Sequence, residues 1–337
     1  MQTNSPFRPF RALFFVLLWV AAAAGCTDLL RPEERTPEVI RTPHFSIITV
    51  GPEDTLAGLA QTHLGSSSHT WRIARYNGVT SAKAGDRLVI PFAHSFYGGL
   101  APNGYQIVPV LNYPKIVSAA KTTDAVSART FESQMLYLHT NGYHTISPSQ
   151  LTSYLRLKAQ LPERAIVITM DTSEAWMFET AYPILKRYGL RAAIFIATRR
   201  IGTAGHMSWQ NLEQMTADGF DIGTSGHSGR HLTRLGAGAR TRSAIETLEA
   251  EILRPKKEIT THLKRPCRFF AYPGGLANDM IIALLKKHGY RAAFTLERGE
   301  NAFFVDSFKI HRAVIGATGG SKQFSQDLKT FITADLR

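Results

Sequence analysis

The side chains of this sequence that could carry out hydrolytic chemistry come directly after apolar segments. Asp171 ends the apolar run 165–171, and the segment 272–274 ends another. His227 and His231 lie four residues apart, just after a third such run. A carboxylate beside imidazole rings can hold a divalent cation or move protons. If these residues act together, the fold must bring the ends of several strands to one edge.

Seven apolar runs of strand length alternate with helical spacing between residues 105 and 335. Continuous apolar strands with helices between them indicate a parallel sheet that helices cover on its outside. Seven such units predict a closed or nearly closed β/α barrel, in which chemistry occurs at the carboxyl ends of the strands. The predicted strands are Ile107–Tyr113, Ala165–Asp171, Ala192–Ala197, Phe220–Ser225, Phe269–Pro273, Ala292–Leu296 and Lys309–Ile315. The predicted helices lie at about 130–141, 177–188, 208–217, 240–263, 277–288 and 321–334.

This region resembles the polysaccharide deacetylase (NodB-homology) family across nearly all of residues 105–316. The resemblance implies an α/β fold, a deformed parallel (β/α) barrel. It also implies removal of N- or O-acetyl groups with a divalent metal, usually zinc, which one Asp and two His hold while a second Asp acts as base. The segments that carry the resemblance include IVPVLNY (107–113), TFESQMLYLHTNGY (130–143), AYPILKRYGLRAAIFI (181–196), SWQNLEQM (208–215), RFFAYPGG (268–275) and KKHGYRAAFT (286–295).

The metal-binding motifs of this family are altered in the sequence. The family motif TFDDG aligns with TMDTS, so Asp171 keeps the position of the base and Thr172 replaces the metal-binding Asp. The motif GSHTxSHPxL aligns with GTSGHSGRHL, which places Ser225 and Gly229 at the two histidine ligands. Neutral hydroxyls and a hydrogen cannot replace a carboxylate and two imidazoles as zinc donors. We therefore expect no catalytic metal and no other cofactor, and a domain that has lost its activity.

Alternatives remain for the histidines and for Asp171. His227 and His231 keep the spacing of the family histidines, shifted by two residues, so a displaced loop could present both to zinc or another divalent metal. Glu174 would then replace the lost carboxylate, and the protein would be an active carbohydrate deacetylase, a hydrolase of carbon–nitrogen bonds other than peptide bonds. Asp171 is either a vestigial base or a carboxylate paired with a barrel arginine such as Arg312.

Two further features are candidates for the site. Tyr272, Pro273 and Gly274 keep the shape of the family's third motif, whose backbone amide helps to hold the acyl oxygen, so we interpret them as a remnant of that oxyanion loop. His311, at a predicted strand end, is a candidate general acid, with a surface histidine as the alternative.

The first 25 residues have the pattern of a secretory signal. Two arginines precede the apolar run ALFFVLLWVAAAAG, which is too short to cross a bilayer as a helix. The run ends in AAGC, which resembles the lipobox of bacterial lipoproteins, so Cys26 is expected to be acylated and to anchor the protein in a membrane. Because Thr27 follows, the resemblance implies the outer membrane, facing the periplasm. Residues 26–44, rich in proline and charge, are predicted to form a tether.

Residues 45–92 show a strand, two helices and a second strand. The segments VGPEDTL, WRIARYNG and AGDRLVIP resemble the LysM family, which implies binding of N-acetylglucosamine-containing glycan such as peptidoglycan. Trp71, within the second helix, is expected to pack in the module's core. The implied glycan groove lies between two loops that contain Gly51, Asp54, Thr55 and Leu56, and Asn77 and Gly78.

The composition is compatible with this organisation. Hydrophobic residues make up 44% of the 337 residues, which excludes a wholly disordered chain, and two cysteines exclude a disulfide scaffold. The formal charge of +13 falls to +11 when the two arginines of the signal are removed. This excess suits anionic lipid or an acidic wall polymer, and export argues against a nucleic-acid partner. We expect an envelope lipoprotein that binds peptidoglycan or a related glycan; a scaffold that holds a protein partner at the wall is a further possibility.

Overall fold

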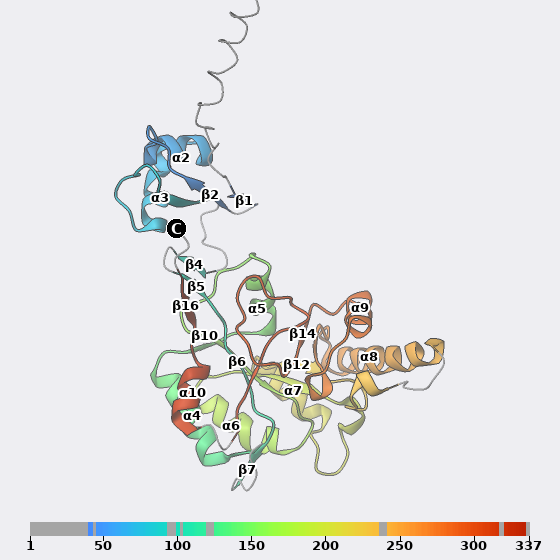
Figure 1. Ribbon diagram of the computed structural model, residues 1–337. Helices are drawn as coiled ribbons and strands as arrows, with labels where there is room; N and C mark the ends of the chain where they lie inside the picture. Colours follow the sequence, from blue (N-terminus) through green and yellow to red (C-terminus); the bar gives the residue numbers. More distant parts are fainter. Residues whose placement is uncertain are drawn as a thin grey trace, which may run out of the picture.

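A computed structural model describes residues 40–42, 45–92, 99–101, 104–118, 125–235, 241–316 and 320–334. The predicted signal segment, Cys26 and most of the predicted tether lie outside these residues. Within the described part of the chain, no helix is both long enough and apolar enough to cross a membrane. The described residues form a small unit, which ends at Phe92, and a large unit that follows it (Figure 1).

The small unit has the predicted order of strand, helix, helix and strand. These elements are β2 (Phe45–Thr49), α2 (Leu56–Leu64), α3 (Thr70–Asn77) and β3 (Arg87–Pro91). The two strands pair antiparallel, and a short strand β1 (Ile40–Arg41) pairs with the other edge of β2. Part of the segment predicted as a tether therefore belongs to this sheet.

The prediction that Trp71 packs in the core is wrong, because 56% of its surface is exposed. Helix α3 begins at Thr70, so Trp71 lies in its first turn. The same helix buries Ile73 and Tyr76 instead, and Ile73 packs against Leu59 and Leu88 of the module core. The helical spacing correctly predicted a buried face, but it did not place Trp71 on the right side of the helix.

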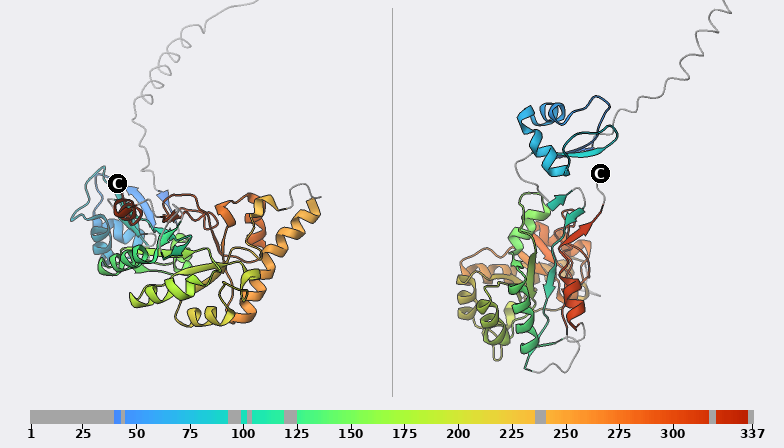
Figure 2. Two further views of the ribbon diagram at one scale, coloured as in Figure 1. Left: turned by 90° about the horizontal axis from the view of Figure 1, so that it is seen from below. Right: turned by 90° about the vertical axis from the view of Figure 1, so that its left-hand side faces the viewer.

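Seven parallel strands form the sheet of the large unit, in the order β14-β13-β12-β11-β10-β6-β15. Each lies within a predicted strand. Figures 1 and 2 show them in the middle of the unit with helices around the outside. The strands are β6 (Val110–Asn112), β10 (Ala165–Met170), β11 (Ala193–Ile196), β12 (Asp221–Thr224), β13 (Phe269–Ala271), β14 (Ala292–Phe294) and β15 (Ala313–Val314).

The chain segment before β15 brings the two ends of this sheet together. Ile310 forms a parallel bridge with Phe294 of β14, and its amide donates to the Ala293 carbonyl. Three residues later, Ala313 pairs with Leu111 of β6. The strands thus form a nearly closed barrel, as predicted.

Helices cover the outside of the sheet and one end of the barrel. Polar residues before the helices fix their starts: Ser127, Ser147, Ser208 and Asn278 each accept a hydrogen bond from a backbone amide of the first turn. The helices are α4 (Ala128–Thr140), α5 (Pro148–Leu155), α6 (Tyr182–Arg187), α7 (Trp209–Ala217), α8 (Thr241–Leu263), α9 (Asp279–Lys287) and α10 (Gly320–Asp327). Short 3₁₀ or π segments are η2 (Ser67–His69), η4 (Met177–Ala181), η5 (Thr198–Arg200), η6 (Leu232–Arg234) and η7 (Pro273–Gly275).

Two parts of the large unit differ from the prediction. The helix predicted to extend to about residue 334 ends at Asp327, because the chain then forms β16 (Phe331–Thr333). This strand pairs with β5 (Gly104–Gln106), which also pairs with β4 (Leu100–Ala101). Helix α5 was not predicted; its Leu151 and Tyr154 pack into the core that includes Val167 and Phe195. A short parallel pair, β7 (Ile116–Val117) and β8 (Val126–Ser127), and a strand β9 (His144–Thr145) beside β10 complete the unit.

Candidate functional site

Asp171 lies directly after β10, at the carboxyl end of the barrel strands, and is paired with Arg312. Both guanidinium nitrogens Nη1 and Nη2 donate to its carboxylate, each at 2.7 Å. The side chain of Asp171 is 22% exposed, whereas that of Arg312 is fully buried. The pairing with a barrel arginine that the sequence suggested is therefore present, and part of the carboxylate remains open at the strand end.

The barrel interior holds Arg312 in place. Its Nε donates to the carbonyl of Thr295 at 2.6 Å, and Nη1 also lies within hydrogen-bonding distance of Asn112 and Thr169. The guanidinium lies 5.9 Å from the ring centroid of Phe195. A buried cation needs such polar and aromatic partners, because burial removes its hydration. Arg312 was predicted from the sequence as a partner of Asp171, whereas the polar residues from neighbouring strands that support it were not predicted.

The two residues after Asp171 are used in local structure. Thr172, at the position of the metal-binding Asp, is buried, and its hydroxyl accepts a hydrogen bond from the amide of Glu174 at 3.0 Å. Ser173 is also buried and exchanges hydrogen bonds with the backbone of Ala197. Glu174 accepts a hydrogen bond from the indole of Trp176 and lies 3.6 Å from the ammonium group of Lys115.

The loop after β12 carries Ser225 and Gly229, which the sequence motifs align with the other two ligands. The amide of Ser225 donates to the carbonyl of Ile196, which continues the pairing of β12 with β11. Gly229 has φ +73°, a backbone conformation that is strained for any residue with a side chain. A histidine at this position would have to adopt that backbone conformation or change the loop.

His227 and His231 have separate surroundings. The Nδ1 atom of His227 hydrogen-bonds with the hydroxyl of Thr198 at 3.0 Å and lies 3.5 Å from the carboxylate of Glu258 in α8. His231 instead lies against Gly274: a Cβ atom built on that glycine would come within 2.0 Å of the imidazole Cε1. The Nδ1 atom of His231 is buried, with no hydrogen-bond partner among the described residues.

These donors do not fit the divalent metal that the family implies. The positions that the sequence motifs align with the ligands hold two hydroxyls and a glycine, and the Thr172 hydroxyl already accepts a backbone hydrogen bond. Across the described ranges, no group of three or more His, Cys, Asp and Glu side chains is arranged to hold a metal ion. Catalytic zinc sites use three protein ligands of these kinds.

Tyr272, Pro273 and Gly274 follow β13 at the same end of the barrel as Asp171. The Tyr272 hydroxyl donates to the carbonyl of Phe308, and burial raises the pKa of this phenol well above its usual value. Gly274 has φ +68°, and the amide of Gly275 donates to the Tyr272 carbonyl at 2.7 Å. This turn positions backbone groups at the strand end, with the His231 ring packed over Gly274.

His311 lies away from this group. It precedes Arg312, whose side chain enters the barrel, and its ring packs against Gly299. Its backbone exchanges two hydrogen bonds with the side chain of Asn301. The structure therefore separates this candidate general acid from the strand ends that carry Asp171 and Tyr272.

In the small unit, the residues of the predicted glycan groove have mainly structural contacts. The Asp54 carboxylate accepts a hydrogen bond from the Gly51 amide, and the Thr55 hydroxyl caps α2. Leu56 is part of the core. Asn77 is buried, and its side-chain amide bonds to the backbone of Ile73 and Val89.

Gly78 ends α3 in a left-handed conformation. Its amide donates to the carbonyl of Ala74, and the amides of Gly51 and Asp54 are used within their own loop. The side chain of Asn77 is also fully used, because all three of its hydrogen bonds are internal.

The nearly closed parallel barrel, with its candidate site at the carboxyl ends of the strands, defines the class to which the large unit belongs. Residues 158–293 match the polysaccharide deacetylase family. The Bacillus subtilis protein YxkH is 27% identical over 61% of this chain and 70% of its own length. A poly-β-1,6-N-acetyl-D-glucosamine N-deacetylase of Staphylococcus aureus is 28% identical over 51% of this chain and 61% of the enzyme.

The solved structure of the deacetylase PplD from Streptococcus pyogenes, in complex with acetate, has the same fold. It superposes with a TM-score of 0.61 and 19% identity, over 66% of this chain and 98% of the other. The large unit is a polysaccharide deacetylase domain of the NodB-homology type. The chain matches less than two thirds of the length of the staphylococcal enzyme.

Proposed function

We propose that this protein is an envelope lipoprotein that binds N-acetylglucosamine-containing glycan and whose deacetylase domain has lost its catalytic metal. One inference from the sequence carries the proposal: the resemblance to the family motifs aligns Thr172, Ser225 and Gly229 with the three metal-ligand positions. His227, the nearest replacement in the sequence, is bonded to Thr198 beside α8. Without a Lewis acid the amide carbonyl of an acetylated sugar is a poor electrophile, so Asp171 alone would not support hydrolysis.

Glycan of this class is the partner that the domain combination favours. The staphylococcal relative is named for its action on poly-β-1,6-N-acetyl-D-glucosamine. The LysM-like segments of the small unit predict recognition of the same sugar. Trp71 adds an exposed aromatic face, which can stack on the apolar face of a sugar ring. We include peptidoglycan as the first glycan to test.

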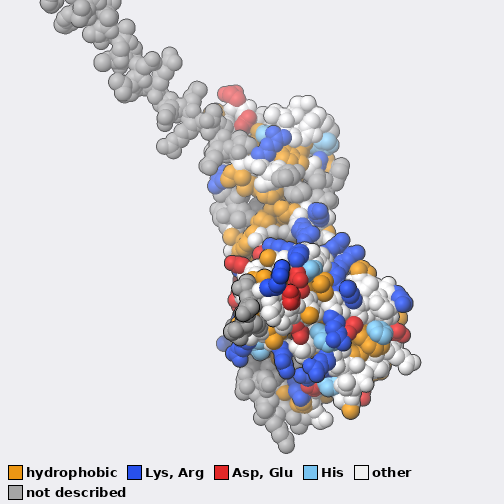
Figure 3. Space-filling model, turned by 90° about the vertical axis from the view of Figure 1, so that its right-hand side faces the viewer, with side chains coloured by type: hydrophobic (Ala, Val, Ile, Leu, Met, Phe, Trp, Pro, Cys, Tyr) orange, Lys and Arg blue, Asp and Glu red, His pale blue; other side chains and the backbone are white. Residues whose placement is uncertain are grey.

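The proposed location is the periplasmic face of the outer membrane, held by acylated Cys26. The basic surface is compatible with an acidic wall polymer: Figure 3 shows many Lys and Arg side chains on one face of the large unit, with fewer acidic ones. Replacing Cys26 with Ser should release the protein into the soluble fraction. If the variant still sediments with membranes, the lipid anchor is refuted.

Metal content and acetate release test the loss of activity. Purified protein incubated with zinc and desalted should retain less than one equivalent, and it should release no acetate from N-acetylglucosamine oligomers. The double variant His227→Ala/His231→Ala shows whether these two histidines hold any zinc that the wild type retains. Stoichiometric zinc that this variant loses, together with acetate release, would overturn the proposal.

Binding to insoluble peptidoglycan tests the glycan claim. The intact protein should be retained, and a chain that lacks residues 45–92 should be retained much less. Trp71→Ala should weaken retention if the indole stacks on sugar, with Leu136→Ala, another exposed apolar residue, as the matched control. Equal retention with and without the small unit would remove that unit from the explanation.

An active deacetylase with a rearranged site is the second candidate. It is favoured by the identity to the staphylococcal N-deacetylase and by the buried, unpartnered Nδ1 of His231 beside the Gly274 turn. In that case the acetate assay gives product, and His231→Ala abolishes it while the fold is retained.

A further inference from the structure

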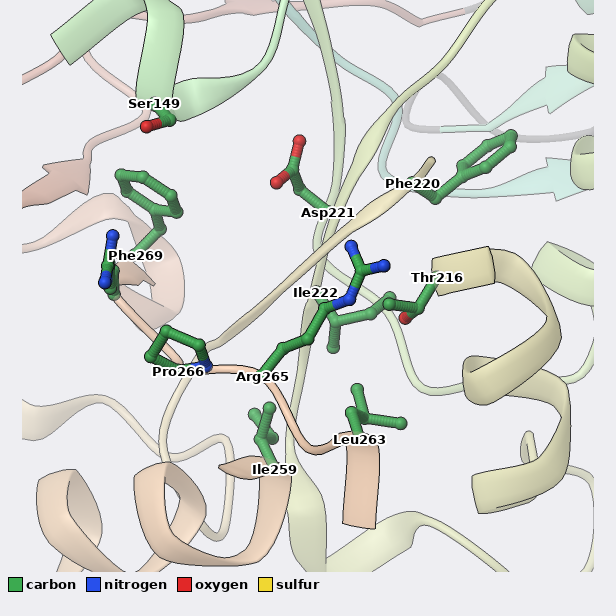
Figure 4. A pocket seen from close by; sticks show the side chains of 11 residues that line it. Ser149, Thr216, Phe220, Asp221, Ile222, Ile259, Leu263, Arg265, Pro266 and Phe269 are labelled. Atoms are coloured by element: carbon green, nitrogen blue, oxygen red, sulfur yellow. The ribbon is translucent and has the colours of Figure 1, made fainter. Parts of the chain in front are cut away.

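A cavity with both charged and apolar lining residues lies at the amino ends of the barrel strands, opposite the end that carries Asp171. Its volume is about 220 Å³. It lies where β12 and β13 begin, and α5, α7 and α8 contribute to its wall (Figure 4). Its lining includes Thr216, Asp221, Arg265 and Arg268.

The three charged side chains of this cavity do not form hydrogen bonds or close ion pairs with one another. Asp221, Arg265 and Arg268 all line it. Arg265 and Arg191 act on Asp221 only through space, and among the described residues none of the three lining side chains forms a hydrogen bond or a close ion pair. Figure 4 shows the Asp221 side chain in the middle of the lining, with Arg265 extending toward the strand that carries it. The end of a β/α barrel opposite the chemistry usually contributes stability alone. Here Arg265 is exposed, and Asp221 and Arg268 are partly buried, so a small ligand can reach their charged groups.

A buried hydroxyl adds to the unused hydrogen-bonding capacity. Thr216, near the end of α7, is 7% exposed, and its Oγ1 has no hydrogen-bond partner in the described part of the chain. A buried polar atom without a partner is destabilising, so such atoms are rare unless a ligand or water completes them. Thr216 therefore points independently to an occupant of the cavity.

The charge distribution decides what kind of occupant fits. Burial raises the pKa of Asp221 to about 6, against the lowering effect of Arg265 and Arg191. At neutral pH the cavity thus contains a carboxylate with incomplete compensation and two guanidinium groups. A bare anion would meet repulsion from Asp221, and a bare cation would meet the two arginines. A molecule that carries both charges can pair with each of them.

We propose that this cavity binds a small zwitterion, with its carboxylate between Arg265 and Arg268 and its ammonium group at Asp221. Amino acids and short peptides are the class with this chemistry. The volume is below that of pockets for drug-sized ligands, which fits a ligand of this size. Because the cavity shares no residue with the strand ends around Asp171, it is independent of the proposed loss of catalysis.

Calorimetric titration of the purified full chain tests the proposal. The probes are alanine and alanyl-alanine as zwitterions, acetate as the carboxylate alone and ethylamine as the ammonium group alone. One of the two zwitterions should bind about tenfold or more tightly than either single-charge probe, because it makes one more charge-assisted contact. The tighter zwitterion reports whether the two charges lie on one carbon or at the two ends of a dipeptide.

Variants assign the contacts. Arg265→Gln and Arg268→Gln should each weaken zwitterion binding about tenfold, whereas Arg242→Gln, an exposed arginine of α8 outside the cavity, should leave it unchanged. Asp221→Asn should remove the preference for the zwitterion over acetate. The proposal is overturned if neither zwitterion binds more tightly than acetate, or if the Arg265→Gln and Arg268→Gln variants bind like the wild type.

Discussion

The pair of Asp171 and Arg312 allows a quantitative test of how this barrel is held together. Asp171→Asn keeps the shape of the side chain but removes the negative charge that is bonded to the buried guanidinium. Arg312 is fully buried, so water cannot take over. Breaking a buried pair by removing one partner costs about 3–5 kcal/mol. We expect a loss of this size in the free energy of unfolding.

Arg312→Met produces a different loss. It removes the donor to the Thr295 carbonyl, and it leaves Asp171 with 22% of its side chain open to water. The Asp171→Asn change should then cost much less in the Arg312→Met background, because no buried cation remains. The double variant should be more stable than the sum of the two single losses predicts, by about 2–3 kcal/mol.

Urea unfolding at pH 7.5, followed by the fluorescence of Trp176 and Trp209 in the large unit, measures all four proteins of this cycle. The exposed pair of Arg187 and Glu132 provides the control cycle, with an expected coupling below about 1 kcal/mol. If the losses at Asp171 and Arg312 add to within about 0.5 kcal/mol, the two groups do not act as a buried pair, and the reasoning fails.

Three other substitutions test particular contacts. Burial raises the folded-state pKa of Asp221 to about 6, above its unfolded value, so the free energy of unfolding should fall as the pH rises from about 4 to 6. Asp221→Asn should remove this fall and raise the free energy of unfolding in urea at pH 7.5 by up to about 3 kcal/mol. Gly274→Ala should lower the melting temperature more than Gly142→Ala. Both glycines have φ +68°, but only at Gly274 would the new Cβ meet a neighbour, the His231 ring. Equal shifts in melting temperature would contradict the observed packing. Asn77→Ala should cost about 2–4 kcal/mol in the unfolding of the small unit, because its three backbone partners are left unsatisfied, and amide hydrogen exchange at Val89 should accelerate.

The sequence predicted the barrel well because its strands are apolar on both faces. All six residues of β10 are buried, so the whole run stands out from its surroundings. The polar ends of β10 and β13 then located Asp171 and the Tyr272 turn. Helix α5 was not predicted, because its sequence, PSQLTSYL, is mostly polar and only eight residues long. Leu151 and Leu155 are one helical turn apart, and a single such pair is too short a pattern to indicate a helix.

Partners of side chains were much harder to predict than elements. His227 and His231 have the spacing of a ligand pair, yet one contacts Thr198 and the other packs on Gly274. Which face of a loop a histidine occupies depends on the positive φ angles of Gly226 and Gly229, and spacing alone does not determine them.

The two ends of the barrel show why charge has to be interpreted with its partners. Asp171 and Asp221 both lie at strand ends, and each has arginines from distant parts of the sequence nearby; Arg312 is 141 positions away from Asp171. At one end the guanidinium enters the barrel and meets its carboxylate in a bidentate pair, which fixes the acid in place. At the other end, Arg265 and Arg268 come from the loop before β13 and leave Asp221 without a direct partner. The same residue types, Asp and Arg, thus form a bidentate ion pair at one end of the barrel and remain without direct partners at the other. Only the second arrangement leaves charged groups that a ligand can bind.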